Sequence, residues 1–199
     1  IEATESRLDF SGTLHNHTDK SVNIEQLWFG EIIIDLGGCA ENYRVYYNSG
    51  CQESSGTCVF SAIKRATGTA KANLDPDDPD TIGMRSIFAS TCIQPGYVRS
   101  QYVTAVYCKD RKSAVCMGNT SFNRAETVFF IKPGASEHKV LVSPLILYNG
   151  LALDPGQELA VEEIAVHADT SPLNALERYV EQVREKKHLR VKPIDAIAG

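Results

Sequence analysis

Apolar and polar residues alternate along most of the chain up to His167, and this two-residue period is typical of half-buried β-strands. Leu8, Phe10 and Leu14 follow the pattern near the start. Residues 102–107 and 113–117 flank a charged loop, which predicts a β-hairpin. Roughly ten to twelve short strands, separated by turns, are expected from this spacing. We therefore predict an all-β fold, a two-sheet sandwich, rather than an α/β fold.

Several segments carry more specific expectations. Residues 32–34 are an uninterrupted run of isoleucine, which predicts a strand covered on both faces. Residues 140–142 and 145–148 each predict a strand of their own. The turn signal Asp154-Pro155-Gly156 predicts a hairpin whose second arm is residues 158–167.

The period changes to 3.6 residues after position 170, which predicts one C-terminal α-helix. Ser171 is a favourable N-cap and Pro172 suits the first helical turn. The apolar side chains fall on one face, which is expected to be the packing face: Leu173, Leu176, Val180 and Val183, with Tyr179 beside them. The helix is expected to end near His188, and to pack on the sandwich or lead into a following domain.

The two ends of the chain suggest a piece of a longer protein. The first residue is Ile1, and residues 191–199 end the sequence in an apolar alternation that looks like the start of a strand. A complete protein whose tail packs back on itself remains the alternative.

Composition narrows the classes of partner. The chain has 199 residues and a net charge of −5, which argues against nucleic acid and against an anionic membrane surface as partners. No apolar run approaches the roughly 20 residues needed to span a bilayer. The six cysteines are too sparse for a disulfide scaffold and lack metal-binding spacing, which favours an intracellular, cytoplasmic protein. The sequons at Asn16 and Asn119 matter only for a secreted eukaryotic protein.

Groups that resemble catalytic or metal sites each have a simpler interpretation. Glu162 and Glu163 are adjacent in a predicted strand, so they should point to opposite faces and lie on a solvated surface. His15 and His17 share one strand face, as a metal pair would, but no third ligand is evident in the sequence. The acidic residues at positions 75–80 lack the pattern of a calcium loop. The sequence therefore predicts no catalytic residue, no bound metal and no cofactor in this chain.

The C-terminal part resembles a known family. Family-36 glycoside hydrolases are α-galactosidases and raffinose-synthase-like enzymes. The region that precedes their catalytic barrel resembles residues 154–163 and 172–183 of this chain. Residues 110–118 resemble a hairpin of that family, and residues 49–54 resemble a degraded form of its Asn-Gly-Tyr-Gln-Ser-Trp loop. The tryptophan of that loop is missing here, because the only tryptophan of the chain is Trp28.

The resemblance implies a galactose-mutarotase-like β-supersandwich over residues 1–168, and a helix and linker over 169–199 that lead to a (β/α)₈ barrel absent from this chain. The barrel would be the partner, and it would hold both carboxylates of a retaining α-galactosidase. The domain itself would be non-catalytic: it would brace the barrel, shape one rim of the sugar site and contribute to homo-oligomer contacts. Gln52 and Glu53 are the candidate sugar-binding residues, because an amide and a carboxylate suit sugar hydroxyls; a plain hairpin tip is the alternative.

Two other functions stay open at this stage. The first is a stand-alone carbohydrate-binding β-sandwich, which would need exposed aromatic side chains to stack on sugars. The second is a structural interaction module without a small ligand.

Overall fold

The computed structural model describes residues 6–38, 42–48, 56–59, 93–94, 97–134, 136 and 138–189. This part of the chain is all-β with one C-terminal helix, which confirms the predicted fold class. Its elements in chain order are β1 (Ser6–Phe10), β2 (Thr13–His15), β3 (Val22–Trp28), β4 (Ile32–Asp35), β5 (Tyr43–Tyr47), β6 (Gly56–Val59), β7 (Ile93–Gln94), β8 (Tyr97–Gln101), β9 (Val103–Cys108), β10 (Ser113–Asn119), β11 (Glu126–Pro133), β12 (Lys139–Leu153), β13 (Glu158–Ala160), β14 (Ile164–Asp169) and α3 (Pro172–Lys186).

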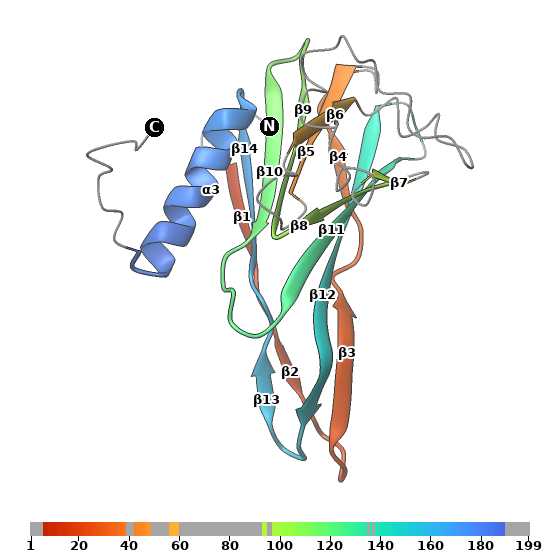
Figure 1. Cartoon of the computed structure of the whole chain (residues 1–199), viewed down its shortest axis with the longest axis vertical. Coiled ribbons are helices and arrows are strands. Elements are labelled where there is room, and N and C mark those ends of the chain that lie inside the picture. Colours follow the sequence, from red (N-terminus) through yellow and green to blue (C-terminus); the bar gives the residue numbers. More distant parts are fainter. Residues whose placement is uncertain are drawn as a thin grey trace, which may run out of the picture.

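Two antiparallel sheets form the sandwich (Figure 1). The sheet that we call sheet I has the strand order β1-β14-β10-β9-β5-β6, and the sheet that we call sheet II has the order β3-β12-β11-β8-β7, with β4 also paired to β12. A short ladder of β2 and β13 extends from one end of the molecule (Figure 1). The predicted hairpin of β9 and β10 is present, and residues 109–112 form its loop.

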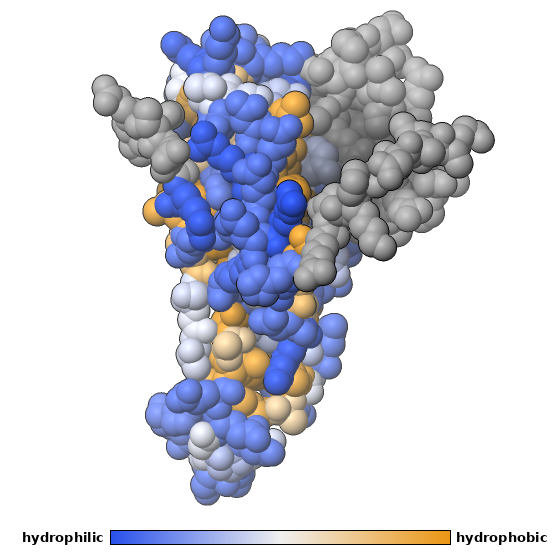
Figure 2. All heavy atoms as spheres, turned by 90° about the vertical axis from the view of Figure 1, so that its left-hand side faces the viewer, coloured by the Kyte–Doolittle hydropathy of each residue, from blue (hydrophilic) through white to orange (hydrophobic). Residues whose placement is uncertain are grey.

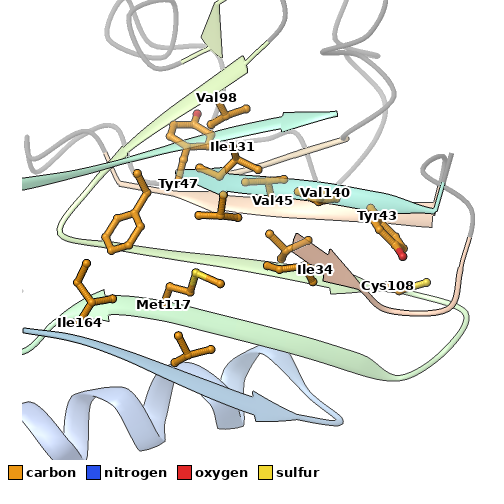
Figure 3. Packing of buried hydrophobic residues seen from close by; sticks show 14 residues of the cluster. Ile34, Tyr43, Val45, Tyr47, Val98, Cys108, Met117, Ile131, Val140 and Ile164 are labelled. Carbon is orange, nitrogen blue, oxygen red and sulfur yellow. The ribbon is translucent and has the colours of Figure 1, made fainter. Parts of the chain in front are cut away.

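The core lies between the inner faces of the two sheets, as the period of two requires (Figure 3). Val45 and Met117 of sheet I pack in the same buried cluster as Val98 and Ile131 of sheet II. A second apolar cluster, which includes Ile146 and residues of the β13 region, continues the core toward the β2–β13 end. Both sheets are therefore held by burial of alternating side chains.

Three local expectations are wrong. The strand at residues 32–34 is not covered on both faces, because Ile34 is 5% exposed while Ile33 is 61% exposed. The two strands expected at 140–148 are one continuous strand, β12. The turn at Asp154 is present, since Gln157 N–H donates to the Asp154 carbonyl, but its two arms do not pair. Instead β13 pairs with β2, and β14 pairs with β1 and β10.

The helix α3 packs on the outer face of sheet I, over β9, β10 and β14 (Figure 1). Its buried residues are Ala175, Tyr179 and Gln182. The predicted packing face is only partly right: Tyr179 is buried and Leu176 and Val183 pack beside it, whereas Leu173 is 62% exposed and Val180 is 58% exposed. Seen from this side, the charged face of α3 forms a hydrophilic band with apolar atoms along its edges (Figure 2).

Candidate functional site

The helix is docked on sheet I through the ring of Tyr179, which lies against a glycine. A Cβ atom at Gly118 would be only 2.2 Å from Cε2 of Tyr179, so the close approach depends on the missing side chain. The Tyr179 hydroxyl donates a hydrogen bond of 2.7 Å to the carbonyl of Asn119. Burial raises the pKa of Tyr179, so the phenol stays neutral and keeps its proton for this bond.

Gln182 links the helix to the edge strand β1 and to the neighbouring strand β14. Its amide nitrogen donates to Asp9 Oδ1 of β1 at 2.8 Å, and its oxygen lies 2.7 Å from Nε2 of His167 in β14. Although partial burial disfavours the charged form of Asp9, hydrogen bonds from Arg7 and Gln182 outweigh it and lower the pKa of Asp9. Asp9 therefore remains a charged acceptor for the helix.

Asp169 fixes the first turn of α3. Its Oδ1 accepts hydrogen bonds from the backbone N–H groups of Thr170 at 2.6 Å and Ser171 at 3.2 Å, and Arg178 lies 3.2 Å from Oδ2. Ser171 occupies the N-cap position as predicted, but its side chain makes no capping hydrogen bond. Desolvation opposes ionisation of Asp169, yet these donors lower its pKa, so a carboxylate faces the positive end of the helix dipole.

The last turn of α3 is tied to the loop between β10 and β11. Lys186 forms an ion pair with Glu163 and donates to the Thr120 hydroxyl at 3.2 Å. Lys187 donates to the side-chain oxygen of Asn123 at 3.1 Å. Both ends of the helix are thus fixed to the sandwich.

Glu162 forms hydrogen bonds to the same loop, between β10 and β11, from its buried side. Its carboxylate accepts hydrogen bonds from the Ser121 hydroxyl and from the backbone N–H groups of Asn123 at 3.1 Å, Arg124 at 2.7 Å and Ala125 at 3.2 Å. Burial alone would raise the pKa of Glu162, but these hydrogen bonds lower it. The predicted solvated surface position is wrong for Glu162, which is 1% exposed. No local pattern around Glu162 indicates its donors, which lie about forty positions away in the loop after β10.

Docking in this orientation leaves apolar side chains of α3 outside. We call Leu173 and Val180 the outer stripe of α3, because both are exposed. Leu176 and Val183 are half-buried and pack against the cluster that holds Tyr179 on sheet I. Leu189 follows at 54% exposure, beside a shallow hollow lined by Glu181, Arg184, Glu185 and His188. The outer stripe is an apolar surface on an otherwise charged helix.

The predicted sugar-binding residues Gln52 and Glu53 lie outside the described residues, as do the acidic residues at 75–80. Among the cysteines whose side chains the structure describes, Cys108 and Cys116 are free and buried. Glu163 and Glu162 point to different partners and do not converge on one point. His15 and His17 are brought together, with ring nitrogens 2.9 Å apart.

Sequence reasoning placed Tyr179 beside the packing face, but it missed Ala175 and Gln182. These three residues recur at helical spacing, but a stripe that contains Gln182 and lacks leucine is weakly apolar, so hydropathy shifts the predicted face toward Leu173 and Val180. Gly118 carries the complementary signal, a glycine in the interior of a strand, which often marks a close approach of another group.

Comparison with known protein families and with curated proteins gives no match to this sequence. Within the described ranges, no helix has the length and apolar character needed to cross a membrane. The same part of the chain contains no cluster of three or more His, Cys, Asp or Glu side chains suited to hold a metal ion. The described structure is therefore an all-β sandwich with one helix fixed to it at both ends and an exposed apolar stripe on that helix.

Proposed function

We propose that this chain is the non-catalytic N-terminal domain of an α-galactosidase-like glycoside hydrolase, and that α3 braces the catalytic barrel. The observation that carries the proposal is the outer stripe: Leu173 and Val180 are more than half exposed on a helix whose position is otherwise fixed. The identity of the barrel comes from the resemblance of residues 154–163 and 172–183 to the region before the barrel in that family.

The contacts that fix α3 to the sandwich support a role in bracing another domain. A helix held at only one end would transmit little force and would roll to bury its outer stripe. Here Asp169 fixes the first turn, Gln182 fixes the middle, and Lys186 fixes the last turn. The outer stripe is therefore presented on a rigid base, and a second domain can bury it without rearranging the helix.

A non-catalytic role also fits the carboxylates of the described residues. Retaining glycoside hydrolysis needs a nucleophile and an acid/base whose carboxyl groups lie about 5 Å apart beside the substrate. Glu162 already accepts several hydrogen bonds in a buried position, and Glu163 is paired with Lys186. Neither is free to attack or protonate a sugar, so this proposal places the reaction on the barrel.

The proposal is tested by comparing the chain with a longer polypeptide that continues past Gly199. Leu173→Asp with Val180→Asp should leave the unfolding free energy of the 199-residue chain within about 0.5 kcal/mol, because exposed positions tolerate polar groups. In the longer polypeptide the same pair should release the domain to limited proteolysis and lower hydrolysis of an aryl α-galactoside at least tenfold.

The matched control is Glu177→Gln with Glu181→Gln, on the charged face of the same helix. These substitutions should change neither proteolysis nor hydrolysis. The proposal is wrong if the longer polypeptide encodes no barrel, hydrolyses no α-galactoside, or is indifferent to changes in the outer stripe.

A carbohydrate-binding sandwich is the second candidate, favoured by one observation. Trp28 is 49% exposed on the outer face of sheet II and stacks on Phe130, with ring centroids 5.8 Å apart. Tyr97 packs against the edge of the same phenylalanine, at 5.4 Å. An exposed indole supported from beneath is suited to stack on the apolar face of a sugar.

Because Trp28 is the only tryptophan, its fluorescence reports on this position directly. Titration with galactose should give a saturable change at millimolar concentrations, and Trp28→Ala should abolish the heat of binding in calorimetry. A flat fluorescence titration would dismiss this candidate and leave the domain-bracing proposal untouched.

A further inference from the structure

The β2–β13 ladder forms a narrow, hydrophilic tip at the end of the molecule away from the β9–β10 loop (Figures 1 and 2). Neither the outer stripe of α3 nor the aromatic group at Trp28 extends to it. The tip carries His15 at the end of β2 and His17 two residues later, both exposed to solvent. Their imidazole rings are in edge-to-face contact, with centroids 3.9 Å apart.

The residue between the two histidines is buried and fully hydrogen-bonded. Asn16 is 4% exposed, and its side-chain nitrogen donates to the carbonyls of Lys20 and Leu153, both at 2.8 Å. Its side-chain oxygen accepts from the backbone N–H and the hydroxyl of Thr18, at 3.0 and 2.7 Å. The Asn16 backbone is also paired, with Gln157 and Gly156 across the ladder. This anchoring holds the Cα atoms of both histidines at fixed positions.

The contacts of His15 define its tautomer. Its Nε2 lies 3.3 Å from the carbonyl oxygen of Gly156, which can only accept, so Nε2 carries the proton. Nδ1 of His15 then has a free lone pair, and it points at Nε2 of His17, 2.9 Å away. In metal sites a ligating histidine usually donates its other N–H to a backbone carbonyl or carboxylate in this way. His15 is thus held in the tautomer that leaves Nδ1 able to bind an ion.

The separation of the two nitrogens fits one coordination geometry. Two imidazole nitrogens bound at about 2.1 Å to one ion, at a right angle, lie about 3 Å apart, whereas tetrahedral coordination places them about 3.4 Å apart. His15 Nδ1 and His17 Nε2 are joined by a hydrogen bond of 2.9 Å, which is close to the right-angle value, so small turns of the two rings suffice to bring both nitrogens to one ion. Right-angled coordination by nitrogen and oxygen is the preference of Cu²⁺ and Ni²⁺.

We propose that His15 and His17 form a binding site for a divalent transition-metal ion with right-angled coordination, Cu²⁺ or Ni²⁺. His15 supplies Nδ1 and His17 supplies Nε2. Each ring turns so that its lone pair points at the ion instead of along the line between the two nitrogens. The proton of His17 moves from Nε2 to Nδ1 through solvent, so two neutral rings bind the ion with no net loss of a proton.

The site is open. The part of the chain that the structure describes offers no third His, Cys, Asp or Glu in a common cluster, so water fills the other coordination positions. Glu158 is paired directly with His15 across the ladder, which places its side chain on the same face and adds negative charge near the ion. An ion with exchangeable water positions is available to react or to bridge to another molecule, unlike a closed structural site. This inference is independent of the domain-bracing proposal.

The test is calorimetric titration of the folded chain with NiCl₂ at pH 7.5, after alkylation of accessible thiols so that cysteines do not compete. One ion should bind per chain. His15→Gln and His17→Gln should each weaken binding at least tenfold, the loss of one of two ligands. His188→Gln removes an exposed histidine of the helix end and should leave binding unchanged.

A second measurement locates the bound ion and does not depend on the dissociation constant. In NMR spectra of the folded chain, a paramagnetic Cu²⁺ ion should broaden amide signals of residues 14–20 and 154–158 first, because the tip is far from the helix. Circular dichroism and melting without metal should match wild type for both single variants, since neither ring packs in the core. The proposal is overturned if millimolar Ni²⁺ gives no saturable binding, if both single variants bind like wild type, or if the broadening appears elsewhere.

Discussion

His167 of β14 donates a hydrogen bond of 2.7 Å to Gln182 of α3, and the direction of this bond is set by a third residue. Asp9 is a carboxylate that can only accept, so the Gln182 amide nitrogen must face it and the amide oxygen must face His167. Nε2 of His167 therefore carries a proton. One side chain of the helix thus binds β1 and β14 together.

Replacing Gln182 with alanine should destabilise the fold by about 1–3 kcal/mol, because His167 loses its acceptor in a buried position and Asp9 loses a donor. Urea unfolding followed by circular dichroism measures the change. Glu181→Ala is the matched control, since it truncates the neighbouring exposed residue, and it should cost little. Equal stability of the two variants would contradict the linking role.

Gly118→Ala should displace the helix. The added Cβ would lie 2.2 Å from the Tyr179 ring, and overpacking of this kind costs about 1–3 kcal/mol. Amide hydrogen exchange should show that α3 loses protection while β11 and β12 keep theirs. Gly12→Ala is the control, because a Cβ there meets no heavy atom within 4 Å. If Gly118→Ala exchanges like wild type, the ring does not depend on the glycine.

Glu162→Gln should cost about 2–3 kcal/mol at pH 7, because an amide cannot accept from all of the donors in the loop after β10. Glu163→Gln, which alters a partly exposed ion pair, should cost well under about 1 kcal/mol. The comparison of unfolding free energies separates the buried carboxylate from its neighbour.

The cost of Glu162→Gln should depend on pH in a defined direction. The pKa of Glu162 is lowered by folding, so its carboxylate stabilises the native state above the unfolded pKa of about 4.3. That contribution is lost as the pH falls through the folded pKa. The difference in stability between wild type and variant should therefore begin to shrink below about pH 4.3 and disappear only below the folded pKa of Glu162. A difference that stays constant down to pH 3 would show that the charge of Glu162 is not what the loop binds.

Neither sequon should carry a glycan in the folded protein. Asn16 is 4% exposed and Asn119 is 0% exposed, and each side-chain nitrogen is used in hydrogen bonds inside the structure. In both, the hydroxyl two residues later donates to the asparagine oxygen, so the Asn-x-Ser/Thr pattern forms a turn here. Mass spectrometry of monomeric protein secreted by a eukaryotic cell measures occupancy. A folded monomer glycosylated at either asparagine would contradict the structure.

Cys116 should be unreactive in the native state. Burial raises its pKa to about 12, so almost no thiolate is present at pH 8. Iodoacetamide should modify Cys116 only after unfolding in urea, as followed by peptide mass spectrometry. Rapid modification of Cys116 in the native protein at pH 8 would mean that α3 opens readily from sheet I.

Most of the candidate site was beyond the reach of sequence reasoning. The position of α3 and the burial of Tyr179 were predicted, but the burial of Ala175 and Gln182 was not, since Leu173 and Val180 are more apolar than these two residues. What decides the face is complementarity: Tyr179 fits the space above Gly118, and Gln182 meets two polar partners. Such a fit involves residues far apart in sequence, and no hydropathy pattern contains it.

By itself the sequence determined the alternation that makes strands, the β9–β10 hairpin, the turn at Asp154 and the extent of the C-terminal helix, because each depends on neighbours a few positions apart. Only the tertiary structure decided which strands pair. β13 joins β2 rather than β12, and this brings His15 beside Glu158 and orders the loop around Asn16. The same is true of Glu162, whose burial depends on donors from another loop. Long-range pairing follows from the packing of whole sheets, where many registers satisfy the same local period.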